Sequence, residues 1–464
     1  MHEEEMTSQD KTKKDMKILL FEGIFNSIKS GLAESFIVPM SVFLKATDFQ
    51  FGMLSSLPLA ISSGTQLFAQ RINYILKTRK TVSFYSAVLQ ALSLILLILF
   101  FIFGWLTVPL MIFFTVLFYV FEKISLPAWN SLMGDIVPEH IRGIYFGKRN
   151  KLNNISNFFA IIMGGAIIGL FGVDQKSKAL AFTIIFLLAA IFRIFSALSI
   201  NKMFEPYFDA PPKPSFSFFD FIKTNAWETN FGAFVMYQMA MNIAIYVSIP
   251  FIGAYLMNEL GWTYWQYTIF LGVNVITKFV CFPLWGKAAD RYGNRKIMVL
   301  SGFLIPLWPI LFLISKNYWW ILGTQVFSGF AWAGFDLVSF NYIFDSTSSV
   351  KRPTCIMYHN FLNGIGILIG SIAGTFLVRM PIILWSKYLL AFLISGILRF
   401  LATILFVGHI DEVRKVKNIR YEELFFDVLP IRPTVNTVVK TIVDSEKSIE
   451  NMMVKGAKRF RIKP

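Results

Sequence analysis

The ionisable side chains of this sequence are spaced for pairing with one another and for binding protons. The segment GKAADRYGNRK, residues 286–296, carries five charges within ten positions, although long apolar stretches flank it. Single carboxylates at Glu34, Glu122 and Asp336 interrupt other apolar stretches. A carboxylate in a low dielectric titrates closer to neutrality, and opposite charges at helix ends can form ion pairs that break when the ends separate. These residues are therefore candidates for proton binding and for gating.

Residue patterns typical of enzymes do not occur in the sequence. The four histidines have no metal-ligand spacing, and the two cysteines cannot form a disulfide scaffold. No Gly-rich phosphate loop, Ser-centred elbow or carboxylate-rich metal pair is present. We expect neither an enzyme nor a cofactor or metal site.

Composition identifies the elements that must position these charges. Hydrophobic residues make up 55% of the 464 residues, and Phe alone occurs 50 times, which is typical of a polytopic membrane protein. A membrane-spanning helix needs about 20 apolar residues. Windows of this length, bounded by charge or by Pro and Gly, predict about twelve helices, at 17–44, 51–72, 81–103, 107–133, 145–171, 178–202, 227–257, 263–286, 296–315, 318–344, 353–378 and 384–408. No small-residue cleavage site follows the first window, so we expect it to remain as a helix.

A long polar break divides the predicted helices six and six. It contains PPKP, which favours extended backbone, and Phe residues that suggest an interfacial segment. The predicted organisation is an N-terminal segment (1–16), an N-terminal six-helix half (17–202), a central loop (203–226), a C-terminal six-helix half (227–409) and a tail (410–464).

Lys and Arg gather on one side of the predicted membrane. They are concentrated in the first 17 residues, the loops after even-numbered helices and the tail, whereas opposite loops such as FGWLTVP are nearly uncharged. The positive-inside rule then places both termini in the cytoplasm, and we expect a multi-pass protein of the cell membrane. This topology and contact with anionic lipids explain the net charge of +16. The basic residues are scattered through loops, so no nucleic-acid partner is expected.

An internal repeat relates the two halves at a fixed offset of 210 residues. Identities between 134–154 and 344–364, with one further pair beyond, are Asp135/Asp345, Arg142/Arg352, Asn150/Asn360, Leu152/Leu362, Asn153/Asn363 and Gly164/Gly374. In each copy an Asp ends one helix, where it can accept bonds from free amides at a helix N-terminus, and an Arg begins the next. Helix-end capping and a gating role are both open interpretations of this repeat.

The segment 286–296 resembles the loop signature G-x-x-x-D-R-x-G-x-R-K of the major facilitator superfamily. The first-half counterpart, QRINYILKTRK at 70–80, keeps Arg79 and Lys80 but has Tyr74 in place of the Asp and lacks the glycines. With the predicted helices, the central loop and the two related halves, the resemblance covers residues 17 to about 409. It implies an all-α polytopic membrane protein of twelve transmembrane helices in two pseudo-symmetric six-helix halves, the major facilitator fold. We expect a monomer.

The resemblance also implies a cytoplasmic gate between two halves that move as rigid bodies. Asp290 would pair near the start of the helix at 142–143, and glycines in the signature would permit close approach and a tight turn. The candidate gate residues are Gly286, Asp290, Arg291, Gly293 and Arg295 of the signature and Asp135, Arg142, Asp345 and Arg352 of the repeat.

The same resemblance implies that the first, fourth, seventh and tenth helices line a central cavity. An ionised side chain at mid-bilayer depth costs about 2.5–3.5 kcal/mol or more, so such residues are functional candidates. The candidate substrate and ion pathway consists of Asn26, Lys29, Glu34, Glu122, Asn242, Asp336 and Asn341. The alternative is internal pairing of Lys29 or Lys123 with Glu34 or Glu122, which would only fix helix packing.

Two further patterns concern arginine and glycine. Arg193 and Arg399 have similar depths in the sixth and twelfth helices, where they would meet carboxylates, an anionic substrate or a lipid phosphate. The glycines at 366, 370 and 374, and those at 165 and 169, are spaced for close helix packing.

The function expected from these observations is secondary transport of a small solute by alternating access, as a symporter or antiporter. Proton coupling through Glu34, Glu122 or Asp336 is a candidate mechanism. One alternative is an exporter of lipids or hydrophobic compounds on the same fold. The other is a non-transporting membrane receptor or scaffold that acts through the tail. The sequence assigns no substrate, direction or coupling ion.

Overall fold

The computed structural model describes most of the chain between residues 8 and 428. The described ranges are 8–76, 78–138, 141–171, 174–205, 217–218, 221–225, 228–348, 351–380, 386–414, 416, 419 and 421–428. Most of the predicted central loop and the tail beyond Val428 lie outside these residues, so the predictions for them stay open.

Six long helices form the N-terminal half, within several residues of the predicted windows except where α1 begins earlier. They are α1 (Ser8–Phe43), α2 (Asp48–Leu76), α3 (Arg79–Ile102), α4 (Val108–Ile136), α5 (Arg142–Phe171) and α6 (Gln175–Lys202). Local sequence explains their starts. A proline lies in the first turn of α4, where a backbone N–H would have no hydrogen-bond partner within the helix. Asp174 caps α6 by accepting the backbone N–H of Lys176 at 3.2 Å.

The C-terminal half contains the remaining long helices and several short ones. They are α9 (Asn230–Tyr246), α10 (Ile249–Ala254), the π-helix η3 (Tyr255–Glu259), α11 (Tyr264–Tyr292), α12 (Asn294–Leu304), α13 (Leu307–Leu311), α14 (Tyr318–Ser346), α15 (Arg352–Val378) and α16 (Lys387–Val407). The short elements η2 (Phe221–Asn225) and α17 (Tyr421–Val428) flank this half. A capping box of Thr263 and Gln266 begins α11, and Asn317 caps α14.

Two of the predicted spans are interrupted. The seventh is divided among α9, α10 and η3, and the ninth is divided between α12 and α13. Pro250 and Pro309 lie just after these interruptions. Because proline has no N–H, Pro309 leaves the carbonyl of Ile305 without its usual helical donor. The sequence windows contained both prolines but did not predict the breaks.

Nine helices in the described part of the chain are long and apolar enough to cross a membrane. The other three predicted spans correspond to α1 and α2, which carry more polar residues, and to the broken pair α12 and α13. Both α1 and α2 lie among the other helices, α1 against α5 and α6, and α2 against α4 and α15. The all-helical class is confirmed, and the count of twelve remains a prediction.

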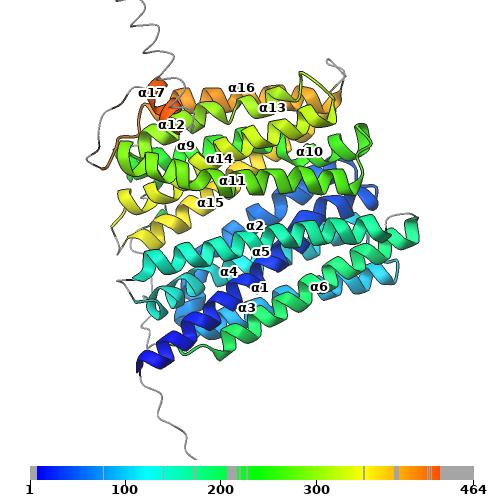
Figure 1. The fold of residues 1–464 in the computed structure, drawn as a ribbon, viewed down its shortest axis with the longest axis horizontal. Helices are drawn as coiled ribbons and strands as arrows, with labels where there is room; N and C mark the ends of the chain where they lie inside the picture. The colour runs from blue at the N-terminus through cyan, green and yellow to red at the C-terminus, as the bar shows by residue number, and fades with distance from the viewer. Residues whose placement is uncertain are drawn as a thin grey trace, which may run out of the picture.

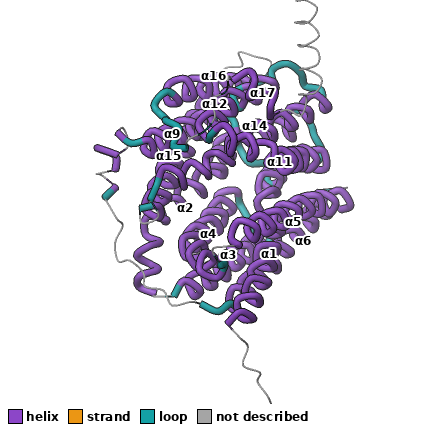
Figure 2. The backbone as a smooth tube through the Cα atoms, turned by 60° about the vertical axis from the view of Figure 1, so that its left-hand side comes forward, coloured by secondary structure: helices purple, strands orange, loops and turns teal. Residues whose placement is uncertain are grey.

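The helices form two blocks (Figure 1). In one, α1 packs against α5 and α6, and α3 against α4 and α6, around a core that includes Phe36 and Phe182. In the other, α9 packs against α15 and α16, and α11 against α14, around Phe234 and Trp285. The main contacts between the blocks are those of α2 with α15 and of α5 with α11 (Figure 2), and α10 also packs against α2.

The two ends of the bundle differ. Both the start of α1 and the helix α17 lie at one end, which we call the terminal side, and the opposite end is the far side (Figure 1). Contacts between the blocks gather on the far side, where Ser371 Oγ donates to the Gly52 carbonyl at 2.9 Å and the rings of Phe182 and Tyr264 meet edge to face. Towards the terminal side the blocks diverge (Figure 1). The structure is therefore closed on the far side.

Glycines in α15 allow α9 to approach closely. A Cβ atom placed on Gly366, Gly370 or Gly374 would lie 2.7, 2.2 or 2.3 Å from backbone carbonyl oxygens of the α9 segment. The prediction that this stripe serves helix packing is confirmed. In the α5 pair, a Cβ on Gly165 would meet Thr268 of α11, but one on Gly169 would meet no atom within 4 Å.

Gly370→Ala should destabilise the fold, because the added methyl group meets backbone of α9 that cannot rotate away. We expect a loss of about 1–3 kcal/mol, seen as a lower midpoint of thermal unfolding in detergent. Gly323→Ala is the matched control, since a Cβ there would have open space in α14. Equal midpoints for the two variants would contradict the packing role.

Candidate substrate and gating sites

The main cluster of charge inside the bundle joins α1 to α4. Lys29 is only 1% exposed, and its Nζ lies 3.3 Å from Glu34 Oε1 and 3.4 Å from Glu122 Oε2. The same ammonium lies 4.8 Å from the centre of the Phe118 ring, within the range of a cation–π contact. The two carboxylates are partly exposed. One buried cation thus holds two accessible carboxylates, and these three predicted residues are brought together.

The two carboxylates differ in how firmly they are held. Glu122 also accepts from Lys123 Nζ at 3.3 Å and from Gln90 Nε2 at 3.2 Å. Among the described residues, Lys29 is the cation within ion-pair distance of Glu34. Donors from three helices therefore hold Glu122 in place. Glu34 has one described ion pair, so it can bind another group once that pair with Lys29 breaks.

A second polar layer joins α1, α5 and α6. Arg193 Nη1 donates to Asn26 Oδ1 at 3.1 Å and to Ser196 Oγ at 2.8 Å. Arg149 Nη2 donates to Glu22 Oε2 at 2.9 Å, and Ser196 Oγ donates to Glu22 Oε1 at 3.1 Å. Asn26 therefore belongs to this layer and orients Arg193. Arg149 and Glu22 were not among the predicted site residues.

The C-terminal half contributes one ion pair at mid-helix. Lys278 Nζ of α11 lies 2.6 Å from Asp336 Oδ2 of α14 and 5.7 Å from the centre of the Trp332 ring. Both charged side chains are partly exposed. Sequence reasoning named Asp336 but missed Lys278, although a lysine inside an apolar window was the available signal.

The two predicted asparagines of this half lie elsewhere. Asn242 Nδ2 donates to the Gln238 carbonyl of its own helix at 3.0 Å. Asn341 Nδ2 donates to Asn294 Oδ1 at 3.4 Å, which places Asn341 beside the start of α12. The described contacts join neither residue to Asp336.

Amide side chains link the halves between α2 and α15. Asn360 Nδ2 donates to Gln66 Oε1 at 2.7 Å. Asn363 Nδ2 lies 3.0 Å from His359 Nε2, and the His359 ring is stacked on Phe234 with 5.6 Å between centres. The repeat identities at Asn360 and Asn363 pointed to this cluster.

Arg399 fills the space beside the two helix breaks. Its guanidinium is fully buried and donates to the Ile305 carbonyl at 3.4 Å and to Ser248 Oγ at 3.0 Å. No described acidic residue lies within ion-pair distance. Pro309 cannot donate to the Ile305 carbonyl, which accepts the Trp308 N–H at 3.3 Å and the Arg399 guanidinium instead.

The loop signature surrounds the turn between α11 and α12 on the terminal side. Gly293 has a φ of +92°, which favours glycine. Asp290 is largely exposed, and its Oδ1 lies 3.5 Å from Arg414 Nη1 of the tail. The Arg291 guanidinium lies 5.0 Å from the ring centre of its neighbour Tyr292.

Other parts of the predicted gate contact their own half. A Cβ on Gly286 would meet Leu337 at 3.8 Å, so this glycine is not essential for packing here. Arg352 donates to the Thr347 carbonyl at 3.1 Å, within its own repeat. The side chain of Arg142 lies outside the described side chains, so the predicted pairing of Asp290 with the start of α5 stays a prediction.

The two repeat aspartates bind basic or amide groups near the starts of α3 and α12. Asp135 pairs with Arg79 Nη1 at 2.5 Å, and Asp345 accepts from Asn294 Nδ2 at 2.6 Å. Arg414 also binds Asp345, with Nε 2.7 Å from Oδ2. The repeat thus places equivalent carboxylates at equivalent helix starts.

Two glutamates that sequence reasoning missed cap those same helices. Glu205 Oε1 accepts the backbone N–H groups of Arg79 at 2.6 Å and Lys80 at 3.3 Å. Glu412 Oε2 accepts the backbone N–H of Arg295 at 2.8 Å. A negative charge at a helix N-terminus is favourable. Each glutamate lies within five residues of the last helix of its half, which was the available signal.

An ion pair crosses between the halves on the far side. Asp48, in the first turn of α2, lies 2.5 Å from Lys387 Nζ and accepts from Tyr388 Oη at 2.9 Å, both at the start of α16. Beside it, Ser386 Oγ donates to Glu259 Oε2 at 2.7 Å. This contact is a candidate far-side gate.

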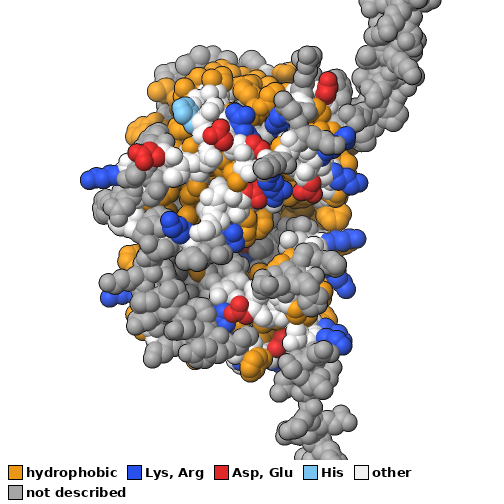
Figure 3. Space-filling view, turned by 90° about the vertical axis from the view of Figure 1, so that its left-hand side faces the viewer, with side chains coloured by type: hydrophobic (Ala, Val, Ile, Leu, Met, Phe, Trp, Pro, Cys, Tyr) orange, Lys and Arg blue, Asp and Glu red, His pale blue; other side chains and the backbone are white. Residues whose placement is uncertain are grey.

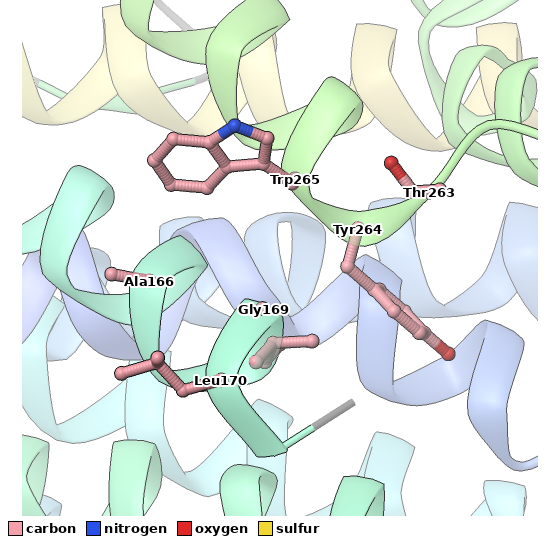
Figure 4. A pocket seen from close by; sticks show the side chains of 7 residues that line it. Ala166, Gly169, Leu170, Thr263, Tyr264 and Trp265 are labelled. Atoms are coloured by element: carbon pink, nitrogen blue, oxygen red, sulfur yellow. The ribbon is translucent and has the colours of Figure 1, made fainter. Parts of the chain in front are cut away.

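A pocket of about 600 Å³ opens between α5 and α11 on the far side (Figure 4). It is lined by Ala166, Ile168, Gly169, Leu170, Thr263, Tyr264 and Trp265. No predicted pathway residue lines it, so it is separate from the ion pairs.

Relatives with similar sequences are transporters by name. An uncharacterised MFS-type transporter of Mycobacterium tuberculosis is 27% identical over 144 residues, which are 31% of this chain and 34% of that protein. The multi-drug resistance efflux pump PmrA of Streptococcus pneumoniae is 25% identical over 210 residues, 44% of this chain and 51% of the pump. The chain thus aligns with about half or less of these relatives.

Solved structures of transporters share the fold. The nucleoside transporter NupG superposes with a TM-score of 0.61 at 15% identity, covering 86% of this chain and 98% of NupG. A bacterial homologue of the iron transporter ferroportin, in an inward-facing state, gives 0.65 at 13% identity, covering 86% and 99%. The profile of the Major Facilitator Superfamily matches residues 19–249 and 229–446. The two family matches together cover most of the chain, and they agree with the two helical blocks and the apolar helices of membrane length. This integral multi-pass membrane protein therefore belongs to the Major Facilitator Superfamily.

Proposed function

We propose that the protein is a secondary transporter that moves a small solute across the membrane by alternating access. The observation that carries this proposal is the partly exposed ion cluster of Lys29, Glu34 and Glu122, set in long helices of one of two blocks that diverge towards the terminal side. Ionised groups inside long apolar helices are costly, which makes them functional candidates, with pairing that only fixes helix packing as the alternative. The names of the relatives, which include efflux pumps, support transport and leave export of hydrophobic compounds as the second candidate.

The test begins with a thermal-shift screen of the purified protein against metabolites and lipophilic cations, because a ligand of the folded state raises its stability. Hits are then followed as flux into proteoliposomes. Truncation after Val428 separates a transporter from a receptor or scaffold, since it removes most of the tail and keeps the packed part. If the truncated protein keeps its flux but no longer performs its role in the cell, the scaffold is favoured. If the full-length protein transports none of the compounds that bind it, the proposal is contradicted.

We infer that the terminal side faces the cytoplasm of a cell whose plasma membrane contains the protein. Lys and Arg side chains are spread over both halves on this face (Figure 3), as the positive-inside rule requires. In a variant without Cys281 and Cys355, a cysteine at Trp105 or Lys316 should react with an impermeant reagent outside intact cells, and one at Pro212 should not. The reverse pattern would overturn this orientation.

Proton coupling follows as a proposal from the two lysine-paired carboxylates, Glu34 and Asp336. Protonating Asp336 would release Lys278, and protonating Glu34 would leave Lys29 with Glu122 as its remaining partner. Either step would weaken an ion pair inside the bundle. Combining Glu34→Gln with Asp336→Asn should therefore abolish gradient-driven accumulation and partly retain exchange. Glu423→Gln, at an exposed carboxylate of α17, is the control. Accumulation that survives the combined substitution would remove both residues from coupling.

A further inference from the structure

The described residues of the first part of the tail, 410–414, 416, 419 and 421–428, pack against the loop signature; we call them the tail segment. The Ile410 carbonyl accepts from Arg295 Nε at 2.5 Å, and the Ile419 carbonyl accepts from Lys296 Nζ at 2.9 Å. The basic residues that end the signature thus bind backbone of the tail. In this structure, with the terminal side open, Arg295 and Lys296 are bound to the tail.

Apolar side chains of the tail segment pack into the core of the C-terminal half. Leu424 of α17 is fully buried and Val428 is 2% exposed, both in the core that contains Trp285 and Tyr292 of α11. The helix α17 contacts both α11 and α12, and it lies over α12 in Figure 1. The tail segment is therefore an integral part of the terminal side of this half.

Arg414 in the tail segment binds two aspartates that belong to the predicted gate. Its Nε and Nη2 lie 2.7 and 3.0 Å from the two oxygens of Asp345, in the bidentate geometry that favours Arg. Its Nη1 reaches Asp290 at 3.5 Å. The hydrogen bond to Asp345 raises the pKa of the Arg414 guanidinium, which stays charged.

We propose that Arg414 regulates the terminal-side gate by holding Asp290 on its own half while that side is open. The proposal rests on alternating access, the proposed function. Asp290 is 79% exposed and lies in the last turn of α11, on the terminal side where the blocks diverge. A gate contact with the start of α5 would have to draw it away from Arg414. The tail segment therefore sets how readily the terminal side closes.

The experiment measures alkylation of single reporter cysteines in full-length protein that lacks Cys281 and Cys355. Ser30→Cys reports access from the terminal side, and Thr375→Cys, buried against α2, reports opening of the far side. Arg414→Gln should slow the first reaction and accelerate the second by about two- to fivefold, the range expected for a partly exposed ion pair. Val413→Thr, at an exposed neighbouring residue, should change neither.

Two further variants make the test specific. Leu424→Asp releases α17 without touching a gate charge and should shift both rates in the same direction as Arg414→Gln. In an Asp290→Asn background, Arg414→Gln should lose most of its effect, because the residue it competes for is gone. An unchanged rate ratio in Arg414→Gln, or an equal effect with and without Asp290, would overturn the proposal. A far-side reporter that never reacts, even when Asp48 is replaced, would overturn alternating access and this proposal with it.

Discussion

Lys29→Met should abolish transport while the protein still inserts into the membrane. The substitution removes the one cation that both Glu34 and Glu122 contact, 3.3 and 3.4 Å away, and leaves an apolar chain of similar length in its place. Breaking a buried ion pair by deleting one partner costs about 3–5 kcal/mol. If the state that binds the solute loses this much free energy of stabilisation, the transport rate falls by more than about a hundredfold.

The matched control is Lys123→Met, because Lys123 is a neighbouring lysine that is 27% exposed and contacts one carboxylate oxygen of Glu122. It should lose far less activity. Adding Glu34→Gln to Lys29→Met should restore thermal stability, since it removes the carboxylate that has lost its described cation, and should leave transport absent. Flux into proteoliposomes and thermal unfolding measure the two effects separately. Recovery of both by the double substitution would show that the cluster only fixes helix packing.

Asp48→Asn should shift the protein towards the state open on the far side. Asp48 joins α2 to Lys387 and Tyr388 of α16, at 2.5 and 2.9 Å, and these contacts can exist only while the far side is closed. A hydrogen bond to a charged group is worth about 1.5–3 kcal/mol. Losing this amount should change the ratio of the two states by about tenfold or more.

The measurement is again alkylation of single cysteines, with Thr375→Cys expected to react faster and Ser30→Cys slower. Asp174→Asn is the control, because Asp174 is another far-side aspartate at a helix start, and its described side-chain bonds are to Lys176 and Ser177 of its own helix. Equal labelling of the Asp48 and Asp174 variants would show that the far side is held by packing alone, through contacts such as Gly165 against Thr268.

Loss of the terminal-side gate contact should have the opposite effect, a shift towards the state that is open on the terminal side. The resemblance of the loop signature predicts that Asp290 belongs to the closed gate, and the structure shows it exposed beside Arg414 with that side open. The two observations are compatible, because a gate contact is broken in the open state. In this structure Arg414 of the tail segment is the cation that pairs with both Asp290 and Asp345.

The sequence by itself determined the helical class, the approximate helix boundaries and the family. It also named Lys29, Glu34, Glu122 and Asp336 as pathway candidates, and the structure places all four in ion pairs. These predictions follow from local properties. A run of about 20 apolar residues must be helical in a bilayer, and a carboxylate such as Glu34 inside such a run is costly wherever its helix lies. The offset of 210 residues likewise needed no structure, since it compares the sequence with itself.

Only the tertiary structure decided which charges meet. Lys29 and Glu122 are 93 residues apart, and Asp48 and Lys387 are 339 apart, so their pairing depends on how helices cross and not on any spacing within one helix. The same is true of Lys278 with Asp336, of Glu205 and Glu412 at the starts of α3 and α12, and of Arg414 over the loop signature. Periodicity tells which face of a helix is polar. The partner of that face is set by packing between helices, where close glycines such as Gly370 and the breaks at Pro250 and Pro309 determine which side chains come within hydrogen-bonding distance.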